Sequence, residues 1–250
     1  MALTPKYFGD FLVTTHNTFQ LRDTNSISFG AVVKLSSPTY REEHFMSNHY
    51  RWNNDFKKIF TTTLFASWEQ PKWLLSTEIR SNFIQHFIYY DTLSHPRQHN
   101  APIWQIQFQA RKDFDWRMFH LGILGVAQYN TGKEVLRLPN FWGRTTLYYQ
   151  GGFIKGKLHA QLGFDLTYNT NYQGDAYNPA LMNFYLQDKE KLTFYPVLDI
   201  FFNIHIKRAR LFFIYQHVNS GMFQGGYYTA PDYAMPDRNV KAGVVWQFFD

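Results

Sequence analysis

Cysteine is absent from the 250 residues, and long apolar runs are absent too. Without cysteine there are no disulfide frameworks, thiolate metal sites or cysteine nucleophiles. No run approaches the roughly 18 consecutive apolar residues expected of a spanning helix. Clustered positive charge is also missing: the net charge is +6, but the basic residues are scattered, unlike a nucleic-acid footprint. These absences disfavour a nucleic-acid partner and a helical membrane protein.

Aromatic residues are abundant, at 20% of the chain with 25 Phe, 17 Tyr and 7 Trp. The mean hydropathy is nevertheless negative, at -0.39. Strands with one lipid-facing side and one wet side require such a mixture of rings and polar residues. In hydrocarbon only helices and closed barrels satisfy every backbone group, so a membrane location would require a barrel.

Alternation with a period of two dominates the chain, and no segment carries a helical stripe. It is clearest from 157 to 168, where Leu158, Leu162 and Phe164 fall on one face and His159 and Asp165 on the other. We predict that the following apolar side chains face outward: Leu158, Leu162, Phe164, Ile200, Phe202 and Ile204. We therefore predict an all-β fold of eleven strands. Their ranges are 10–22, 26–36, 57–68, 73–90, 103–111, 117–129, 142–151, 157–168, 198–207, 208–218 and 240–249.

The connections between these strands alternate in length, as they do in membrane barrels. The short ones are predicted at Asp23 to Ser26, Glu69 to Lys72, Lys112 to Trp116, Gly151 to Lys155 and Lys207 to Arg208. The long ones are predicted at 37–56, 91–102, 130–141, 169–193 and 219–237. This pattern predicts an antiparallel transmembrane β-barrel of about 10 to 14 strands, forming a single domain over residues 1–250.

An odd strand count conflicts with the even number found in single-chain bacterial barrels. Either a further strand lies near residues 1–9, or the chain is the C-terminal part of a larger barrel. The start, Met1 to Lys6, lacks the apolar core of a secretory signal, which an exported protein needs. We therefore expect a chain without its signal or a downstream fragment. In the latter case the sheet is open, and the strands at 10–22 and 240–249 do not pair with each other.

The last strand places Val240, Ala242, Val244, Trp246 and Phe248 on one face and ends in aromatic residues. This ending resembles the signal by which outer-membrane barrels of Gram-negative bacteria are recognised and inserted. The resemblance assigns that role to Gly243, Trp246, Phe248 and Phe249. It implies a location in the bacterial outer membrane, with the barrel assembly machinery, outer-membrane lipids and lipopolysaccharide as partners.

Several short motifs resemble those of a family of large outer-membrane β-barrels, the putative porins of Bacteroidetes. They are Arg137-Leu138-Pro139, Tyr177-Asn178-Pro179, Phe184-Tyr185-Leu186-Gln187, Ile206-Lys207-Arg208-Ala209-Arg210, His217-Val218-Asn219-Ser220-Gly221, Met235-Pro236-Asp237-Arg238 and Trp246-Gln247-Phe248-Phe249-Asp250. The resemblance extends from about residue 45 and is strongest from Arg137 onward. It implies passive transport of small hydrophilic solutes. Members of the family are usually longer than this chain, which again favours a fragment.

The polar side of the predicted strands supplies candidates for lining a pore. They are Glu78, Arg80, Asn82, His86, Lys157, His159, Asp165, Asp199, Asn203, His205 and Lys207. Charges in a channel can select permeants. The same residues could instead only pair across strands and hydrate the interior.

A hydrolase is a further alternative, because His217 to Gly221 is similar to a motif of outer-membrane lipid hydrolases. There histidine and serine lie two apart and share one face of a strand. Here Asn219 occupies that position and Ser220 points to the opposite face. We therefore predict no catalytic residue and no enzyme.

Two pairs of histidines, His44 with His49 and His95 with His99, lie in predicted loops without carboxylates at a recognised ligand spacing. We predict no metal and no cofactor. The preferred function is a pore for small hydrophilic solutes. A narrow barrel filled by side chains, with a structural or assembly role, is the alternative. A soluble ligand-binding barrel is a third reading.

Overall fold

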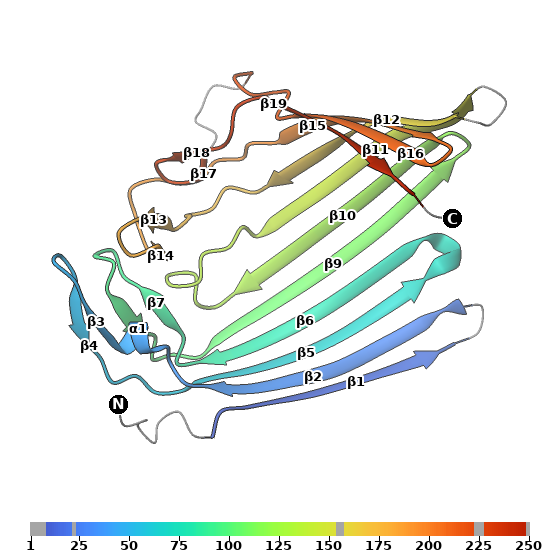
Figure 1. Ribbon diagram of the computed structural model, residues 1–250. Helices are drawn as coiled ribbons and strands as arrows, with labels where there is room; N and C mark the ends of the chain where they lie inside the picture. Colours follow the sequence, from blue (N-terminus) through green and yellow to red (C-terminus); the bar gives the residue numbers. More distant parts are fainter. Residues whose placement is uncertain (1–8, 22–23, 154–157, 223–227, 249–250) are drawn as a thin grey trace.

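The computed structural model describes residues 9–21, 24–153, 158–222 and 228–248. Eleven long strands form one antiparallel sheet that curves into a trough (Figure 1). In spatial order they are β1 (Phe11–Gln20), β2 (Ser26–Ser36), β5 (Ile59–Gln70), β6 (Leu75–Gln85), β9 (Ile103–Trp116), β10 (Phe119–Asn130), β11 (Phe141–Phe153), β12 (Leu158–Asn169), β15 (Val197–Ile206), β16 (Ala209–Gln216) and β19 (Asn239–Trp246). Within the described ranges no helix has the length and apolar character to cross a membrane.

Each of the eleven predicted ranges overlaps one of these strands over most of the strand's length, so the strand prediction is confirmed. Most strand ends shift by up to three residues, and two larger details differ. The range 73–90 is broken at His86, whose positive φ of 57° ends β6 and separates it from a short strand, β7 (Ile88–Tyr90). Residues 112–116 were predicted as a connection, but they continue β9 because the apolar and polar alternation continues through Phe114 and Trp116. The turn lies at Arg117 and Met118 instead.

The register assigns the side chains of all eleven strands to two faces. Residues that are paired across neighbouring strands lie on the same face of the sheet. His159, His205 and Arg210 are paired in a row across β12, β15 and β16, so all three lie on one face. The neighbouring row on the other face holds Leu158 and Ile206. The side that carries His159 is polar along most of the sheet, and the other side is apolar.

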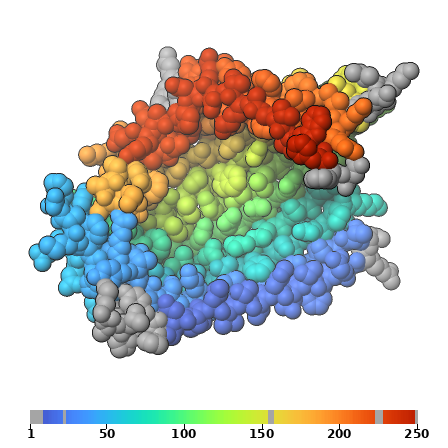
Figure 2. Space-filling model, viewed as in Figure 1, coloured from blue at the N-terminus to red at the C-terminus, as the bar shows by residue number. Residues whose placement is uncertain are grey.

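The apolar face is exposed. Leu64 is 54% exposed, Ile79 is 51% and Leu162 is 54%. The predicted outward set lies on this face: Leu158, Leu162, Phe164, Ile200, Phe202 and Ile204. The polar face lies inside the trough, because both hollows over the sheet are lined mainly by its side chains. Figure 2 looks into this hollowed side. The predicted division into an apolar outside and a polar inside is confirmed.

The two outer strands are not paired with each other. In the described part of the chain β1 pairs with β2 alone, and β19 pairs with β16 alone. They form opposite edges of the trough (Figure 1). The expected open sheet is therefore what the structure has.

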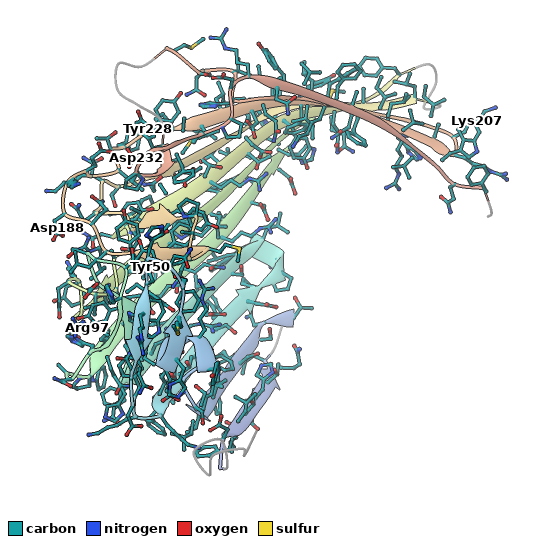
Figure 3. All side chains as sticks on the ribbon, turned by 60° about the vertical axis from the view of Figure 1, so that its left-hand side comes forward. Tyr50, Arg97, Asp188, Lys207, Tyr228 and Asp232 are labelled. Atoms are coloured by element: carbon teal, nitrogen blue, oxygen red, sulfur yellow. The ribbon has the colours of Figure 1, made fainter. Side chains whose placement is uncertain are left out.

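The described parts of the long connections gather at one end of the trough, and the described short turns lie at the other (Figure 1). Four short turns bend through residues with positive φ, namely Thr24, Leu74, Arg117 and Lys207. Leu74 follows a 3-10 turn, η3 (Pro71–Trp73). The alternation of connection lengths along the chain is thus confirmed as a division between two ends of the sheet. Figure 3 shows Lys207 far from Tyr50, Arg97, Asp188 and Asp232.

The long connections contain short elements of their own. These are α1 (Tyr40–Glu43), β3 (His44–Met46) with β4 (Arg51–Asn53), β7 with β8 (Pro96–Gln98), β13 (Ala176–Asn178) with β14 (Asn183–Tyr185), and β17 (Tyr228–Ala230) with β18 (Tyr233–Ala234). The one-turn helix α1 forms because Thr39 and Glu42 complete a capping box.

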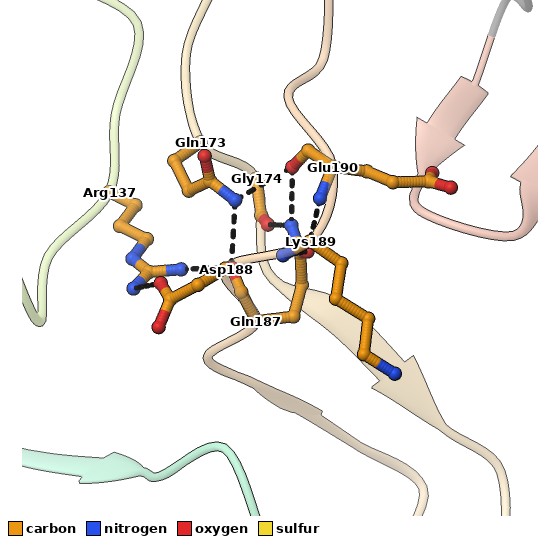
Figure 4. Close-up of polar contacts among 7 residues, drawn as sticks. All are labelled: Arg137, Gln173, Gly174, Gln187, Asp188, Lys189 and Glu190. Atoms are coloured by element: carbon orange, nitrogen blue, oxygen red, sulfur yellow. Dashed lines mark hydrogen bonds and ion pairs between the residues drawn. The ribbon is translucent and has the colours of Figure 1, made fainter.

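These connections pack against one another and over the polar face. Ile103 of β9 is fully buried beneath Val135 and Leu186, which come from two different connections. Arg137 donates hydrogen bonds to the Gln187 carbonyl at 2.5 Å and to the Asp188 carboxylate at 2.7 Å (Figure 4). The connections therefore form one assembly at the end of the trough, which we call the loop cap: the described residues of 37–58, 86–102, 131–140, 170–196 and 217–238.

Candidate pore wall

A chain of polar side chains crosses the inside of the trough near the loop cap. The Thr63 hydroxyl donates to Asn82 Oδ1 at 2.7 Å, and Asn82 Nδ2 donates to Gln105 Oε1 at 3.0 Å. Gln105 Nε2 then donates to Gln128 Oε1 at 3.2 Å, and Gln128 Nε2 donates to the Pro139 carbonyl at 2.8 Å. This chain links four strands to the loop cap and leaves amide and hydroxyl groups facing the trough.

Ion pairs occupy the middle and far parts of the same face. They join Arg80 to Glu78 at 2.7 Å, Arg111 to Asp113 at 3.2 Å and Arg144 to Asp165 at 2.7 Å. Beside them, His120 Nδ1 lies 2.6 Å from Asp115 Oδ1. Most of these side chains are partly exposed, so each pair adds little to stability. These charged side chains make the inner face a hydrated surface that carries both positive and negative charges.

Two hollows lie on this face toward the end with the short turns. The first, of about 460 Å³, lies over β12, β15 and β16. The second, of about 470 Å³, lies over β9, β10 and β11, and its lining includes Arg111, Asp113, Asp115 and Arg144. The charges of the second hollow are paired with carboxylates, whereas the described lining of the first contains no carboxylate.

Eight of the eleven predicted pore-lining residues lie on the inner face. They are Glu78, Arg80 and Asn82 on β6, His159 and Asp165 on β12, and Asp199, Asn203 and His205 on β15. The Asp199 carboxylate accepts the backbone N–H of His217 at 2.7 Å, which ties it to the loop cap.

Two of the other three candidates are not on the wall of strands. His86 lies just beyond β6, and its Nδ1 is 3.1 Å from the Lys58 carbonyl oxygen. Lys207 forms the tight turn between β15 and β16, away from the inner face. Lys157 lies outside the described residues.

Several polar residues of the wall were not among the candidates. They are Gln105, Gln128, Arg111, Asp113, Arg144, Gln150, Gln161 and Arg210. The period of two in their own strands places each on the polar side, so that signal could have found them. Which of them are neighbours depends on the register, which a single sequence does not show.

The structure describes three of the four residues that were predicted to form the insertion signal. Trp246 is 57% exposed on the outer face, whereas Gly243 lies on the inner face opposite Phe212. Phe248 is 75% exposed and follows the end of β19. Phe249 lies outside the described residues.

The segment that was considered for hydrolase chemistry, His217 to Gly221, has buried side chains that hold neighbouring segments together. His217 is 4% exposed, with Nδ1 2.7 Å from the Pro236 carbonyl oxygen and Nε2 2.9 Å from the Tyr195 hydroxyl. Asn219 accepts the N–H of Leu198 at 2.9 Å and donates to the Pro196 carbonyl at 2.5 Å. Both side chains hold the loop cap to the start of β15.

Two carboxylates of the loop cap have perturbed acidity. Burial alone would raise the pKa of Asp91, but the N–H groups of His95 and Leu93 and the Arg97 guanidinium lower it overall. Burial raises the pKa of Asp175, and the nearby Arg137 charge offsets this only in part. The Asp175 Oδ1 atom is buried without a hydrogen-bond partner in the described structure. Asp91 is thus stabilised as a carboxylate and Asp175 is not.

Comparison with known proteins gives a family and a fold. A family model described as "Putative porin" matches residues 1–250. No curated protein matches the chain. Among solved structures, the FrpB iron transporter from Neisseria meningitidis, F3-3 variant, is similar with a TM-score of 0.60 and 12% sequence identity. The similarity covers 93% of this chain but 38% of the transporter, so the chain spans well under half the length of that protein.

Proposed function

Because the chain belongs to the family described as putative porins, we propose that it forms the wall of an outer-membrane channel for passive diffusion of small hydrophilic solutes. The observation that carries the proposal is the division of the sheet into two faces. Large apolar side chains are exposed on the outside, and amides, hydroxyls and ion pairs line the inside. A soluble protein rarely exposes an apolar surface of this extent. A membrane barrel requires it.

A functional pore also needs both edges of the sheet to be paired, because an open edge is not tolerated in hydrocarbon. We propose that in the full-length protein further strands pair with the free edges of β1 and β19. The partners of such a barrel are outer-membrane lipids and lipopolysaccharide around it and the barrel assembly machinery during insertion. We propose neither a catalytic role nor a bound cofactor.

One observation favours a second candidate, a barrel that is closed by its own side chains. The loop cap extends over the inner face and buries Ile103, with Val135 and Leu186 above it. If the cap fills the whole cross-section, the protein has a structural or assembly role. If it only narrows one end, solutes pass.

Conductance distinguishes these two functions. The full-length protein is reconstituted into planar lipid bilayers, and stepwise currents proportional to voltage are expected. Heat-modifiable migration on gels serves as the control for a folded barrel. Folded, inserted protein that carries no current would contradict the pore and favour the filled barrel.

A further inference from the structure

We propose that the hollow over β12, β15 and β16 is a binding site for the phosphate or carboxylate group of a small anionic solute, with Arg210 as its principal charged contact. This inference rests on the proposed function, because it names the class of solute that the channel takes. The hollow has a volume of about 460 Å³, which is enough for a small metabolite headgroup.

The register builds the site. Pairing across three strands aligns His159, His205 and Arg210 in one row, and the His159 and His205 rings are 6.5 Å apart between centroids. The row is flanked by Gly152 and Val245, which contribute no polar group. Imidazole and guanidinium nitrogens are therefore the polar groups that the row presents to the trough. Arginine suits this role because its planar fork matches phosphate and carboxylate oxygens.

The next row toward the loop cap holds three amides, on β11, β12 and β15, and continues with Phe212 on β16. Asn203 Nδ2 donates to Gln161 Oε1 at 3.3 Å, and Gln161 Nε2 donates to Gln150 Oε1 at 2.9 Å. This direction of donation leaves the Gln150 amide nitrogen as a donor at the end of the row. The amide row fixes the floor of the hollow beside the basic row.

Charge distinguishes this hollow from its neighbour. Over β9 to β11, Arg111 and His120 are each paired with an aspartate. In the first hollow Arg210 is exposed and has no ion-pair partner in the described part of the chain, and the described lining includes no Asp or Glu. The next carboxylate along β12 is Asp165, six residues from His159, which is roughly 20 Å along a strand. That exceeds the Debye length of about 8 Å at physiological salt, so Asp165 does little to cancel the Arg210 charge.

A free solute, and not a lipid, is the ligand. The row lies on the inner face, whereas the exposed apolar side chains that would meet lipid lie on the outer face. In the closed barrel of the proposed function, a lipid headgroup would have to cross the sheet to reach Arg210.

Binding of inorganic phosphate to the full-length protein in detergent tests the site. Arg210→Gln removes one positive charge from the hollow, and Lys34→Gln is the matched control, since exposed Lys34 lies on the same face at the far side of the trough, on β2. We expect Arg210→Gln to weaken phosphate binding about tenfold or more, because a charge-assisted hydrogen bond is lost. Lys34→Gln should change it by less than about twofold.

Reversal potentials across a salt gradient provide the second readout. Arg210→Gln should shift permeability toward cations more than Lys34→Gln does. Equal effects of the two variants, or a wild-type protein that does not bind phosphate, would overturn the anion site. Phosphate binding that depends on Arg210 in a protein without conductance would support the site while contradicting the pore.

Discussion

Gly163 of β12 lies at a crowded position on the inner face. A Cβ atom there would lie 2.4 Å from the Leu147 carbonyl oxygen, 2.4 Å from Tyr148 Cβ and 2.8 Å from Phe201 Cζ. Two of these positions belong to backbone or to a Cβ atom, which cannot rotate away. Glycine is therefore required for the close approach of β11 and β15 to β12.

We predict that Gly163→Ala destabilises the folded sheet by about 1–3 kcal/mol, the usual cost of overpacking. The control is Gly152→Ala on the same face, where the nearest atom, on the His159 ring, is at 3.6 Å. Urea unfolding of the protein in lipid vesicles measures both. Equal midpoints for the two variants would contradict the crowding at Gly163.

Asp175 predicts a pH dependence of the loop cap. Burial raises its pKa above the ordinary value of 3.8, so the folded connection disfavours the charged form. The stability of residues 170–196 is therefore greatest below that ordinary value and is lost as the pH rises through the raised pKa. Asp175→Asn, which keeps the shape and removes the charge, should stabilise this segment at neutral pH and flatten its pH profile. Hydrogen exchange of the segment as a function of pH measures this, and an unchanged profile would refute it.

At the scale of elements, the strands have an apolar face and a polar face, which the proposed function assigns to lipid and to water. Leu162 near the middle of β12 is 54% exposed on the outer face, and Gln161 beside it faces the trough. We predict that Leu162→Arg costs about 2–4 kcal/mol of stability in a bilayer, as expected for arginine near the midplane. Gln161→Arg should cost far less. The folded fraction after refolding into vesicles measures both, and equal losses would show that β12 does not face lipid.

The long strands could be predicted because an apolar side and a polar side impose a period of two over eight or more residues. Turn residues also fall regularly between them. The short strands β13 and β14 could not be predicted, since three residues show no period. The capping box of Thr39 and Glu42 could have predicted the start of α1, but the prediction rested mainly on strand alternation.

The wall was predicted less fully than the strands. Alternation placed eight candidates on the inner face, but it does not show which strands are neighbours. Arg210 became part of a row with His205 through the register set by the tight turn at Lys207. Lys207 was predicted to line the inner face because the alternation of β15 extends to it in the sequence. In the structure it lies in the turn after β15, where the alternation no longer determines which way a side chain points.

At the scale of the whole molecule, the loop cap and the short turns lie at opposite ends of the sheet (Figure 1). In an outer-membrane barrel the longer loops are extracellular and the short turns periplasmic. Proteinase K added to intact cells should therefore cut within 219–237 and leave the turn at Lys207 and Arg208 uncut. Mass spectrometry of the fragments reads the sites. Cleavage at Lys207 or Arg208 with 219–237 intact would reverse the topology.

The absence of cysteine from these 250 residues allows the central claim to be tested directly, because an introduced cysteine is unique among them and any cysteine elsewhere in the full-length protein is replaced beforehand. The claim is that β12 crosses a membrane with one wet face and one lipid face. Single cysteines are placed at His159, Gln161 and Thr167 on the inner face and at Leu158, Leu162 and Leu166 on the outer face.

Reaction of each variant with a water-soluble thiol reagent is measured for the full-length protein in lipid vesicles, with unfolded protein as the reference for full labelling. The account predicts rapid labelling at the three inner positions and little at the three outer ones. Labelling that does not alternate along β12, or that is faster at Leu158, Leu162 and Leu166, would contradict it.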